Sequence, residues 1–244
     1  MKRVKLIISY DGTNYCGWQR QNNQSSVQQV IENRLSEFTK EDITIHASGR
    51  TDTNVHAFGQ VAHFDTQSVI PAENFSGIMN SLLPEDIKVL SSTQVDESFH
   101  ARFSAVSKHY RYLLDNTRMS LPIYRNYHAA TGYKLDFDLM QLAAEKMLGI
   151  HDFKGFMSVH CPMENTERII YRSELEKDDS LITYNIEGNG FLRHMVRIIM
   201  GTLIDIGRGR MPIEQIDRIF KEKDRMLAGK TADAKGLILV SVKY

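Results

Sequence analysis

The sequence predicts a protein of mixed α and β class, built from two domains. Segments rich in β-branched and aromatic residues alternate along the chain with segments of helical periodicity, and this alternation excludes an all-α or an all-β fold. The chain has 244 residues, of which 42% are hydrophobic and 25% are charged. This composition is typical of a globular protein, and the length suits one large domain or two domains of roughly 100–150 residues each.

Strand-like segments occur along the whole chain. They are rich in β-branched and aromatic residues and partly alternate between apolar and polar positions. The first is followed by Asp11-Gly12, a strong turn signal, and the last is mostly apolar, as expected of a buried strand. The predicted strands are 4–10, 42–48, 55–64, 87–95, 103–114, 169–175, 181–187 and 237–242.

Helical segments are recognised by their ends. Ser26 with Gln29 forms a capping-box pattern, and apolar residues then recur at helical spacing. Pro84 ends the second helix, Gly149 suits the C-terminal cap of the third, and Pro212 suits the first turn of the last. The predicted helices are 26–38, 74–83, 139–149, 191–206 and 212–220.

The chain is expected to divide near residue 104, into an N-terminal domain of residues 1–104 and a C-terminal domain of residues 105–244. No stretch rich in Pro, Gly or Ser marks a flexible linker at this point. The two domains are therefore expected to pack tightly against each other.

Cysteine content and hydropathy predict where the protein works. The two cysteines, Cys16 and Cys161, allow at most one pair, which favours a reducing compartment. The N-terminus lacks the long apolar stretch and the cleavage site of a signal peptide. No run of about 18 apolar residues predicts a membrane span. We therefore expect a cytoplasmic protein without a membrane partner.

The formal net charge of zero hides regions of opposite sign. Between residues 100 and 125, five basic residues stand against Asp115 alone, whereas residues 173–187 contain one Lys and five acids. Aromatic side chains among basic ones are typical of surfaces that bind RNA, and a solvated strand face over buried tyrosines produces the same pattern. The tyrosines in or beside the basic region are Tyr110, Tyr112, Tyr124 and Tyr127.

Common catalytic and cofactor motifs are missing from the sequence. It has no phosphate-binding P-loop and no G-x-S-x-G nucleophile elbow. His56 and His63 do not have the spacing of a zinc protease, and His160-Cys161 has no second cysteine pair. Residues 188–190 match only a fragment of the dinucleotide-binding fingerprint. We therefore expect neither a metal nor a nucleotide cofactor.

Residues 47–57, with the sequence A-S-G-R-T-D-T-N-V-H-A, form a polar stretch between two strand-like segments. It places the carboxylate of Asp52 two residues after Arg50. Catalytic groups concentrate in loops that a sheet holds in place, although an Asp in a loop more often forms a turn. The pattern alone leaves both interpretations of Asp52 open.

Several stretches match one family signature together. S-G-R-T-D-T-N-V-H-A is followed by G-Q-V-A-H-F, and further matching stretches occur in the family's order at residues 10–21, 99–112, 188–203 and 230–244. By these motifs the chain resembles the tRNA pseudouridine synthase A (TruA) family over essentially its whole length.

The resemblance implies a fold, a reaction and a partner. The implied α+β fold has two ferredoxin-like or RNA-recognition-like domains, joined into an extended antiparallel sheet with helices on one face and a basic cleft. The implied reaction is the isomerisation of uridine to pseudouridine at positions 38, 39 and 40 of the tRNA anticodon stem-loop. The family acts as a homodimer on tRNA and uses no cofactor and no metal.

The resemblance also implies four site residues. Asp52 matches the catalytic aspartate and Arg197 the arginine that pairs with it. Arg50 matches the arginine that assists flipping of the target nucleotide, and Tyr110 the tyrosine that packs on the target uracil. From the residues alone, Arg193 and Arg197 are expected on one helix face, because they lie four apart. The exact chemical step that the aspartate performs is left open.

Two residues depart from the family pattern. Asn54 stands where the family usually has Gly, and Asp233 stands where it usually has Pro. Asn is the non-Gly residue that best tolerates a left-handed backbone, so the loop of Asp52 is expected to keep its shape. An acid near the RNA surface weakens binding, so the departures bear on substrate preference rather than on the reaction.

Three hypotheses about function were compared. The first is a tRNA uridine isomerase that works through Asp52. The second is an RNA-binding module that has lost its chemistry, but such a protein has no reason to keep Asp52 together with Arg197. The third is a nucleoside or glycoside hydrolase with two carboxylates, and no second acid occurs in a comparable motif. The first hypothesis fits the sequence best.

Overall fold

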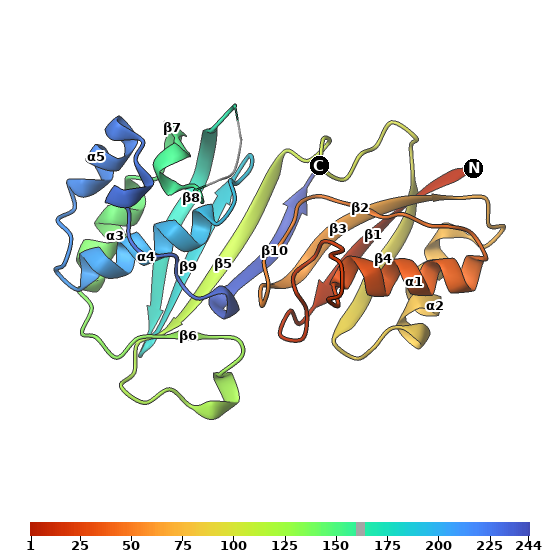
Figure 1. The fold of residues 1–244 in the computed structure, drawn as a ribbon, viewed down its shortest axis with the longest axis horizontal. Coiled ribbons are helices and arrows are strands. Elements are labelled where there is room, and N and C mark those ends of the chain that lie inside the picture. Colours follow the sequence, from red (N-terminus) through yellow and green to blue (C-terminus); the bar gives the residue numbers. More distant parts are fainter. Residues whose placement is uncertain (160–163) are drawn as a thin grey trace. The chain divides into compact units, whose positions relative to one another are not determined.

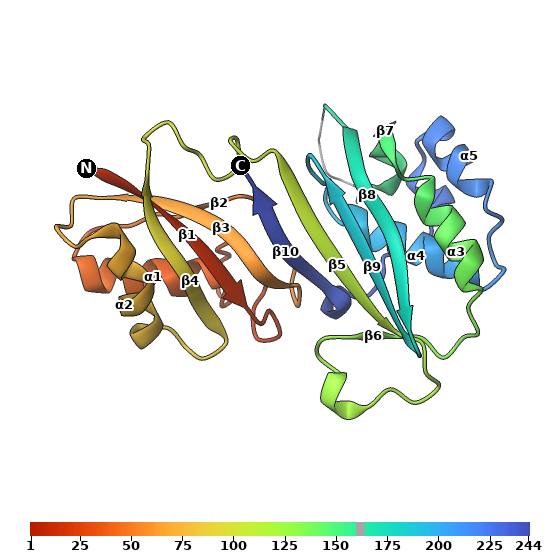
Figure 2. The ribbon, with the colours of Figure 1, turned by 180° about the vertical axis from the view of Figure 1, so that it is seen from behind.

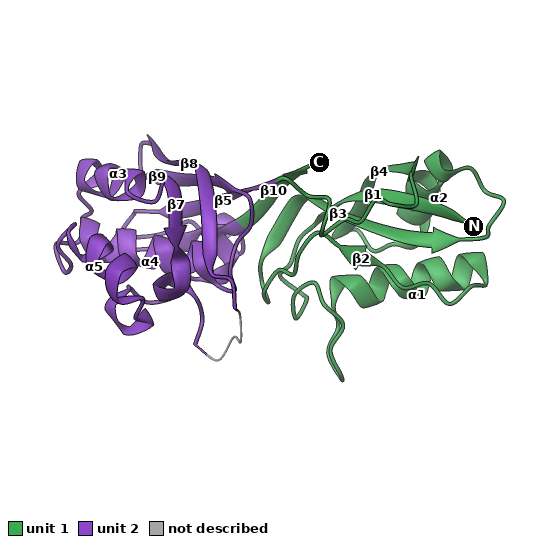
Figure 3. Cartoon of the chain, turned by 90° about the horizontal axis from the view of Figure 1, so that it is seen from above, with its two compact units in different colours: residues 1–106, 238–244 green, residues 107–237 purple. Residues whose placement is uncertain are grey.

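The computed structural model describes residues 1–159 and 164–244; His160 and Cys161, considered above as metal ligands, lie outside this described part. The chain forms two compact units (Figure 3). Unit 1 comprises residues 1–106 and 238–244, and unit 2 comprises residues 107–237. The last strand thus belongs to unit 1, whereas the sequence analysis assigned it to the domain 105–244.

Unit 1 is built on a sheet with the strand order β4-β1-β3-β10, in which the short β2 also pairs with β3. Strand β1 is antiparallel to β3 and β4. Strand β10 pairs in parallel with β3 through Ile238 and Leu239, and this pairing is why the C-terminal strand belongs to unit 1. The strands are β1 (Lys2–Tyr10), β2 (His46–Ala47), β3 (His56–Thr66), β4 (Ile87–Val95) and β10 (Leu237–Lys243).

Two helices complete unit 1, α1 (Val27–Thr39) and α2 (Phe75–Leu82). Figures 1 and 2 show the elements of each unit from opposite sides. Ser26 caps α1 by accepting a hydrogen bond from the Gln29 N–H at 3.3 Å, so the predicted cap is confirmed. Lys40 ends α1 in a left-handed conformation, with φ of 60°.

The predicted strand 42–48 is wrong over most of its length, since only β2 pairs with another strand. The backbone N–H of Ile43 donates to the Ser36 side chain at 3.0 Å, and that of Ile45 donates to the Glu32 carboxylate at 2.9 Å. Ser36 and Glu32 lie on α1. This segment has buried apolar residues like a strand, but side chains of a helix replace the neighbouring strand as hydrogen-bond partners.

The strands of unit 2 follow the order β5-β9-β8-β7, and the short β6 pairs with β5. Neighbouring strands along this order are antiparallel. The strands are β5 (Ser107–Asp115), β6 (Ala129–Ala130), β7 (Gly149–Asp152), β8 (Glu167–Asp178) and β9 (Leu181–Gly188). The helices are α3 (Phe137–Glu145), α4 (Met195–Gly207) and α5 (Gln215–Glu222).

The helices of unit 2 are shorter than predicted at three ends. Helix α3 stops at Glu145, and Gly149 instead begins β7 with φ of 94°. Helix α4 begins after His194, whose left-handed conformation, with φ of 62°, is not helical. Pro212 does not open a helix, because it lies in the turn before α5, where its carbonyl accepts from the Gln215 N–H at 3.1 Å.

None of the helices in the described part of the chain has the length and the apolar character that a membrane crossing needs.

Candidate active site

Asp52 lies in the loop between β2 and β3, within unit 1. Asp52 is half-buried, whereas Arg50 is exposed and Thr51 is buried. The loop starts at Ser48, whose N–H donates to the Val61 carbonyl of β3 at 2.8 Å. The loop therefore leaves the sheet from a fixed point, two residues before Arg50 and four before Asp52.

A tight turn follows Asp52. The Val55 N–H donates to the Asp52 carbonyl at 3.2 Å, and Asn54 within this turn has φ of 63°. A left-handed residue at the third position is what a type II turn requires, and Gly or Asn supplies it at the lowest cost. The expectation that Asn54 takes the place of the usual glycine is confirmed.

The N-terminal stretch 10–18 packs directly on this loop. Gly17 has φ of 97°, and a Cβ atom at Gly17 would lie 2.5 Å from the Thr51 carbonyl oxygen and 3.0 Å from the Asp52 carbonyl carbon. The Trp18 N–H donates to the same Thr51 oxygen at 3.1 Å. A side chain at Gly17 would therefore displace the backbone that carries Asp52.

Gly12 makes a second close approach, to the far end of the loop. A Cβ atom there would overlap the carbonyl group of Val55. The Gly12 N–H donates to Nδ1 of His56 at 3.0 Å. Neither Gly12 nor Gly17 was among the predicted site residues, although both lie in the stretch 10–21 that matches the family, and this match was the available signal.

Tyr110 lies in β5, in unit 2, opposite Ile186 of β9. It is 8% exposed, and its ring packs edge-on against Phe191 with the centroids 5.0 Å apart. The ring is therefore fixed by its surroundings, as a residue that packs against a base must be.

Arg197 lies in the first turns of α4 and is half-buried. Its Nε donates to the Ala232 carbonyl at 2.8 Å, and the Ala232 N–H donates back to the Arg197 carbonyl at 3.0 Å. The C-terminal stretch thus orients the guanidinium. Arg193 lies before the helix and is exposed, so the expectation that Arg193 and Arg197 share one helix face is wrong.

Asp233, the second departure from the family pattern, is exposed and caps a short 3-10 helix, Ala234–Gly236. Its carboxylate accepts from the Lys235 N–H at 3.4 Å and lies 3.7 Å from the Lys235 ammonium group. Its carbonyl accepts from the Tyr112 hydroxyl at 2.9 Å. Asp233 therefore has a local structural role, and Lys235 partly balances its charge.

The four tyrosines of the basic region have two kinds of surroundings. Tyr110 and Tyr112 are buried in the sheet of unit 2, in agreement with the interpretation as core residues. Tyr124 and Tyr127 are 44% and 41% exposed, on the arm between β5 and β6. The two arm tyrosines therefore expose much more of their surface than Tyr110 and Tyr112 do.

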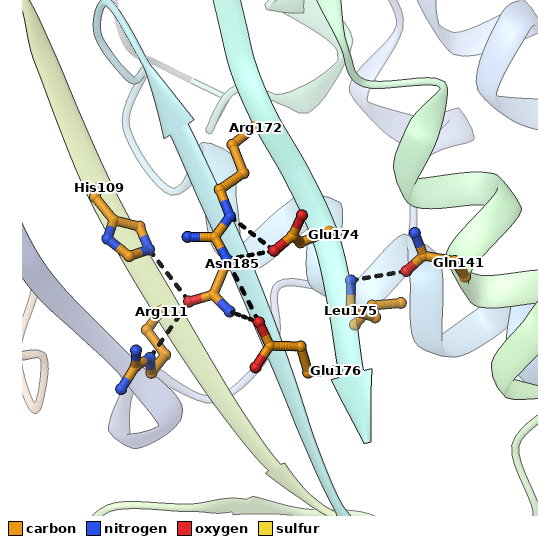
Figure 4. A network of polar contacts seen from close by, with 8 residues as sticks. All are labelled: His109, Arg111, Gln141, Arg172, Glu174, Leu175, Glu176 and Asn185. Carbon is orange, nitrogen blue, oxygen red and sulfur yellow. Dashed lines mark hydrogen bonds and ion pairs between the residues drawn. The ribbon is translucent and has the colours of Figure 1, made fainter. Parts of the chain in front are cut away.

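Polar contacts across the sheet of unit 2 account for other charges (Figure 4). Arg111 and His109 of β5 both bond Oδ1 of Asn185, at 3.3 Å and 3.2 Å. Asn185 in turn donates to Glu176 at 3.3 Å, and Arg172 forms ion pairs with Glu174 and Glu176. Arg172, on the same strand, thus neutralises part of the negative charge of the acidic region 173–187.

The sequence-predicted residues are distributed over both units. Arg50 and Asp52 share one loop of unit 1, and Tyr110 and Arg197 belong to β5 and α4 of unit 2. Over residues 1–159 and 164–244, no three His, Cys, Asp or Glu side chains form a group that could hold a metal ion.

Comparisons with known proteins agree on one family. A family model described as tRNA pseudouridine synthase matches residues 6–104 and 143–244. The protein named tRNA pseudouridine synthase A of Acetivibrio thermocellus is 46% identical over 246 residues, with 100% of both chains covered. Proteins of the same name are 46% identical in Ruminiclostridium cellulolyticum and 42% in Thermoanaerobacter sp., again with 100% of both chains covered. The chain therefore belongs to the tRNA pseudouridine synthase A family.

Proposed function

We propose that this protein isomerises uridine to pseudouridine in the anticodon stem-loop of tRNA, at positions 38, 39 and 40, with Asp52 as the nucleophile. The observation that carries the proposal is the loop of Asp52, whose backbone is held on both sides of this residue. Such a loop presents one carboxylate in a defined position, as a catalytic group requires. Membership of the family points to the same reaction.

The chemistry matches a carboxylate that acts without a redox partner. The bond between ribose C1′ and uracil N1 breaks, and a bond between C1′ and C5 forms. N1 gains a proton and C5 loses one, so the product is an isomer of the substrate. Asp52 attacks C1′ as the uracil leaves, as carboxylates do in glycoside chemistry, and it departs when C5 bonds to C1′.

The other predicted residues assist Asp52. The family resemblance assigns to Arg197 the role of favouring the ionised form of the catalytic carboxylate, as a paired guanidinium does. Arg50 stacks in the space that the flipped nucleotide leaves, because a guanidinium can stack as well as bind phosphate. Tyr110 packs on the uracil, and its contact with Phe191 holds the ring in place.

The protein binds the substrate tRNA through basic and aromatic side chains. The arm between β5 and β6, residues 116–128, contains Arg118 and Arg125 and no acidic residue, and it exposes Tyr124 and Tyr127. These groups suit contacts with phosphates and unpaired bases, so binding weakens as salt rises. We further propose that the protein acts in the cytoplasm as a homodimer.

The first experiment measures tritium release from tRNA that carries 5-tritiated uridine, because isomerisation removes the hydrogen at C5. The wild-type protein releases tritium. Asp52→Asn binds the same tRNA, because the two side chains have nearly the same shape, but its release is lost. A filter-binding assay on both proteins checks that the tRNA is still bound.

Two other outcomes contradict the proposal in different ways. Wild-type release that persists in Asp52→Asn removes the nucleophile assignment and keeps the reaction. Tight tRNA binding without release by the wild-type protein favours the alternative of an RNA-binding module.

A further inference from the structure

A buried hydrogen bond links the residue before Asp52 to the first strand of unit 1. The Tyr10 hydroxyl lies 2.8 Å from Oγ1 of Thr51, and both residues are buried. Tyr10 is the last residue of β1, and Thr51 adjoins Asp52 in the chain. This one hydrogen bond between side chains thus ties the residue next to the candidate nucleophile to strand β1.

The side chain of Gln60 in β3 holds the same loop through two further hydrogen bonds. Its Oε1 accepts from the Ser48 hydroxyl at 2.7 Å, and its Nε2 donates to the Gly49 carbonyl at 3.0 Å. Three residues on the N-terminal side of Asp52, namely Ser48, Gly49 and Thr51, are therefore bonded to strands β1 and β3.

Only a small displacement of this backbone is compatible with catalysis. The Cα atoms of Thr51 and Asp52 are joined through one rigid peptide unit, about 3.8 Å across, so a shift of Thr51 moves Asp52 with it. Catalytic groups are held to about 0.5 Å, and a misplacement of about 1 Å costs up to about a hundredfold in rate.

The surroundings of Tyr10 suit it to holding a position rather than to moving a proton. Burial raises the pKa of Tyr10 above its usual value, so its hydroxyl stays protonated at neutral pH. Its hydrogen-bond partner, Thr51, is uncharged and belongs to the loop itself.

We propose that Tyr10 is a positioning residue for the isomerisation: through its bond to Thr51, its hydroxyl holds the loop 48–52 so that the Asp52 carboxylate meets the nucleoside in reactive geometry. The proposal rests on the proposed function, because it assigns to Asp52 the reacting carboxylate.

The test compares two variants that each lose one buried hydroxyl. Tyr184 in β9 is fully buried, and its hydroxyl lies 2.8 Å from the Ser173 hydroxyl, so Tyr184→Phe removes a bond of the same kind in unit 2. Both Tyr10→Phe and Tyr184→Phe are expected to lower the unfolding temperature to a similar extent. Only Tyr10→Phe is expected to lower kcat for pseudouridine formation, by about tenfold to a hundredfold, with KM for tRNA within about twofold.

Variants of Thr51 test the other end of the bond. Thr51→Val removes the hydroxyl and keeps the shape, so it is expected to lower kcat as Tyr10→Phe does. Thr51→Ser retains the oxygen and is expected to restore most of that rate. The double variant Tyr10→Phe with Thr51→Val is expected to be no slower than the slower single variant, because both changes remove the same bond.

Three results would overturn the proposal while the wild-type protein is active. They are an unchanged kcat in Tyr10→Phe, an equal loss of kcat in Tyr184→Phe, and Thr51→Ser as slow as Thr51→Val. A wild-type protein that forms no pseudouridine contradicts the proposed function itself, so the two failures are distinguishable.

Discussion

At the scale of the residue, each residue of the Asp52 loop contributes a different contact or backbone conformation. Thr51 is held through both its hydroxyl and its carbonyl, and the Asp52 carbonyl closes the following turn. Asn54 supplies the left-handed backbone conformation, and Val55 is buried. Changes to the backbone here are therefore expected to alter the reaction rate without altering the carboxylate.

Gly17→Ala tests the close approach of the N-terminal stretch. A methyl group there would lie 2.5 Å from the Thr51 oxygen, at a φ of 97° that costs an L residue about 1–2 kcal/mol. We expect the free energy of unfolding to fall by at least this amount and kcat to fall about tenfold or more. Denaturant unfolding and tritium release measure the two effects.

The matched control for this change is Gly77→Ala in α2. A Cβ atom at Gly77 would have no atom within 4 Å, so Ala is expected to stabilise the helix by about 0.5–1 kcal/mol and to leave kcat unchanged. A Gly17→Ala protein as stable and as active as wild type would contradict the contact.

At the scale of the element, α1 is joined by hydrogen bonds to the segment 42–45, which leads into β2 and the loop of Asp52. The buried Glu32 accepts from the Ile45 N–H at 2.9 Å, from the Gln28 side-chain amide at 2.9 Å and from the Arg20 guanidinium. One carboxylate thus accepts hydrogen bonds from a helix side chain, a backbone N–H and a guanidinium. This arrangement explains why the segment 42–45 stays extended without a neighbouring strand.

Glu32→Gln is expected to lower the free energy of unfolding by about 1–3 kcal/mol, because an amide that replaces a carboxylate turns a donor toward groups that are themselves donors. Glu37→Gln on the same helix is the control. Glu37 pairs with Arg34 at the exposed surface, and its loss costs less than about 1 kcal/mol. Urea midpoints of the two variants measure the difference, and equal midpoints would contradict the role of Glu32.

At the scale of the whole molecule, stability depends on pH through the buried His63. His46, His63 and His100 meet in unit 1, with ring centroids between 4.8 Å and 5.9 Å apart. Burial, followed by the charges of Arg3 and the neighbouring histidines, lowers the pKa of His63 to about 4. The folded protein therefore keeps this imidazole neutral at a pH where an unfolded chain protonates it.

The sign of the pH effect follows from this difference. Between about pH 6.5 and pH 4 the unfolded state binds a proton at His63 that the folded state does not, so stability falls as the pH falls through this window. We expect His63 to account for about 2–3 kcal/mol of the loss. Asp65, whose pKa is lowered by its bond to Arg3, loses its contribution only below its unfolded pKa of about 3.9.

Thermal unfolding of His63→Gln between pH 7 and pH 4 tests this expectation. The variant is expected to lose less stability over the window than the wild-type protein does. His100→Gln serves as the control, because His100 is less buried and is expected to flatten the curve less. A His63→Gln curve as steep as that of wild type would contradict the assignment.

Local chemistry explains which elements were predictable. Ser26 caps α1 with its own side chain, and the predicted strand 87–95 coincides with β4. These features depend on residues a few positions apart, so a short stretch of sequence contains the information. The prediction that a helix begins at Pro212 was wrong, because this proline starts a turn. Proline suits both the first turn of a helix and the start of a β-turn.

The sequence by itself determined the family, predicted Asp52 as the reacting residue and indicated that the loop tolerates Asn54, because motif and backbone preference are local properties. Only the tertiary structure decided which distant groups meet: Gly17 with Thr51, Tyr10 with Thr51, and β10 with β3. The partners in these contacts lie tens to hundreds of residues apart, and no periodicity or cap encodes such a pairing. It arises when the sheet forms and brings the backbones together.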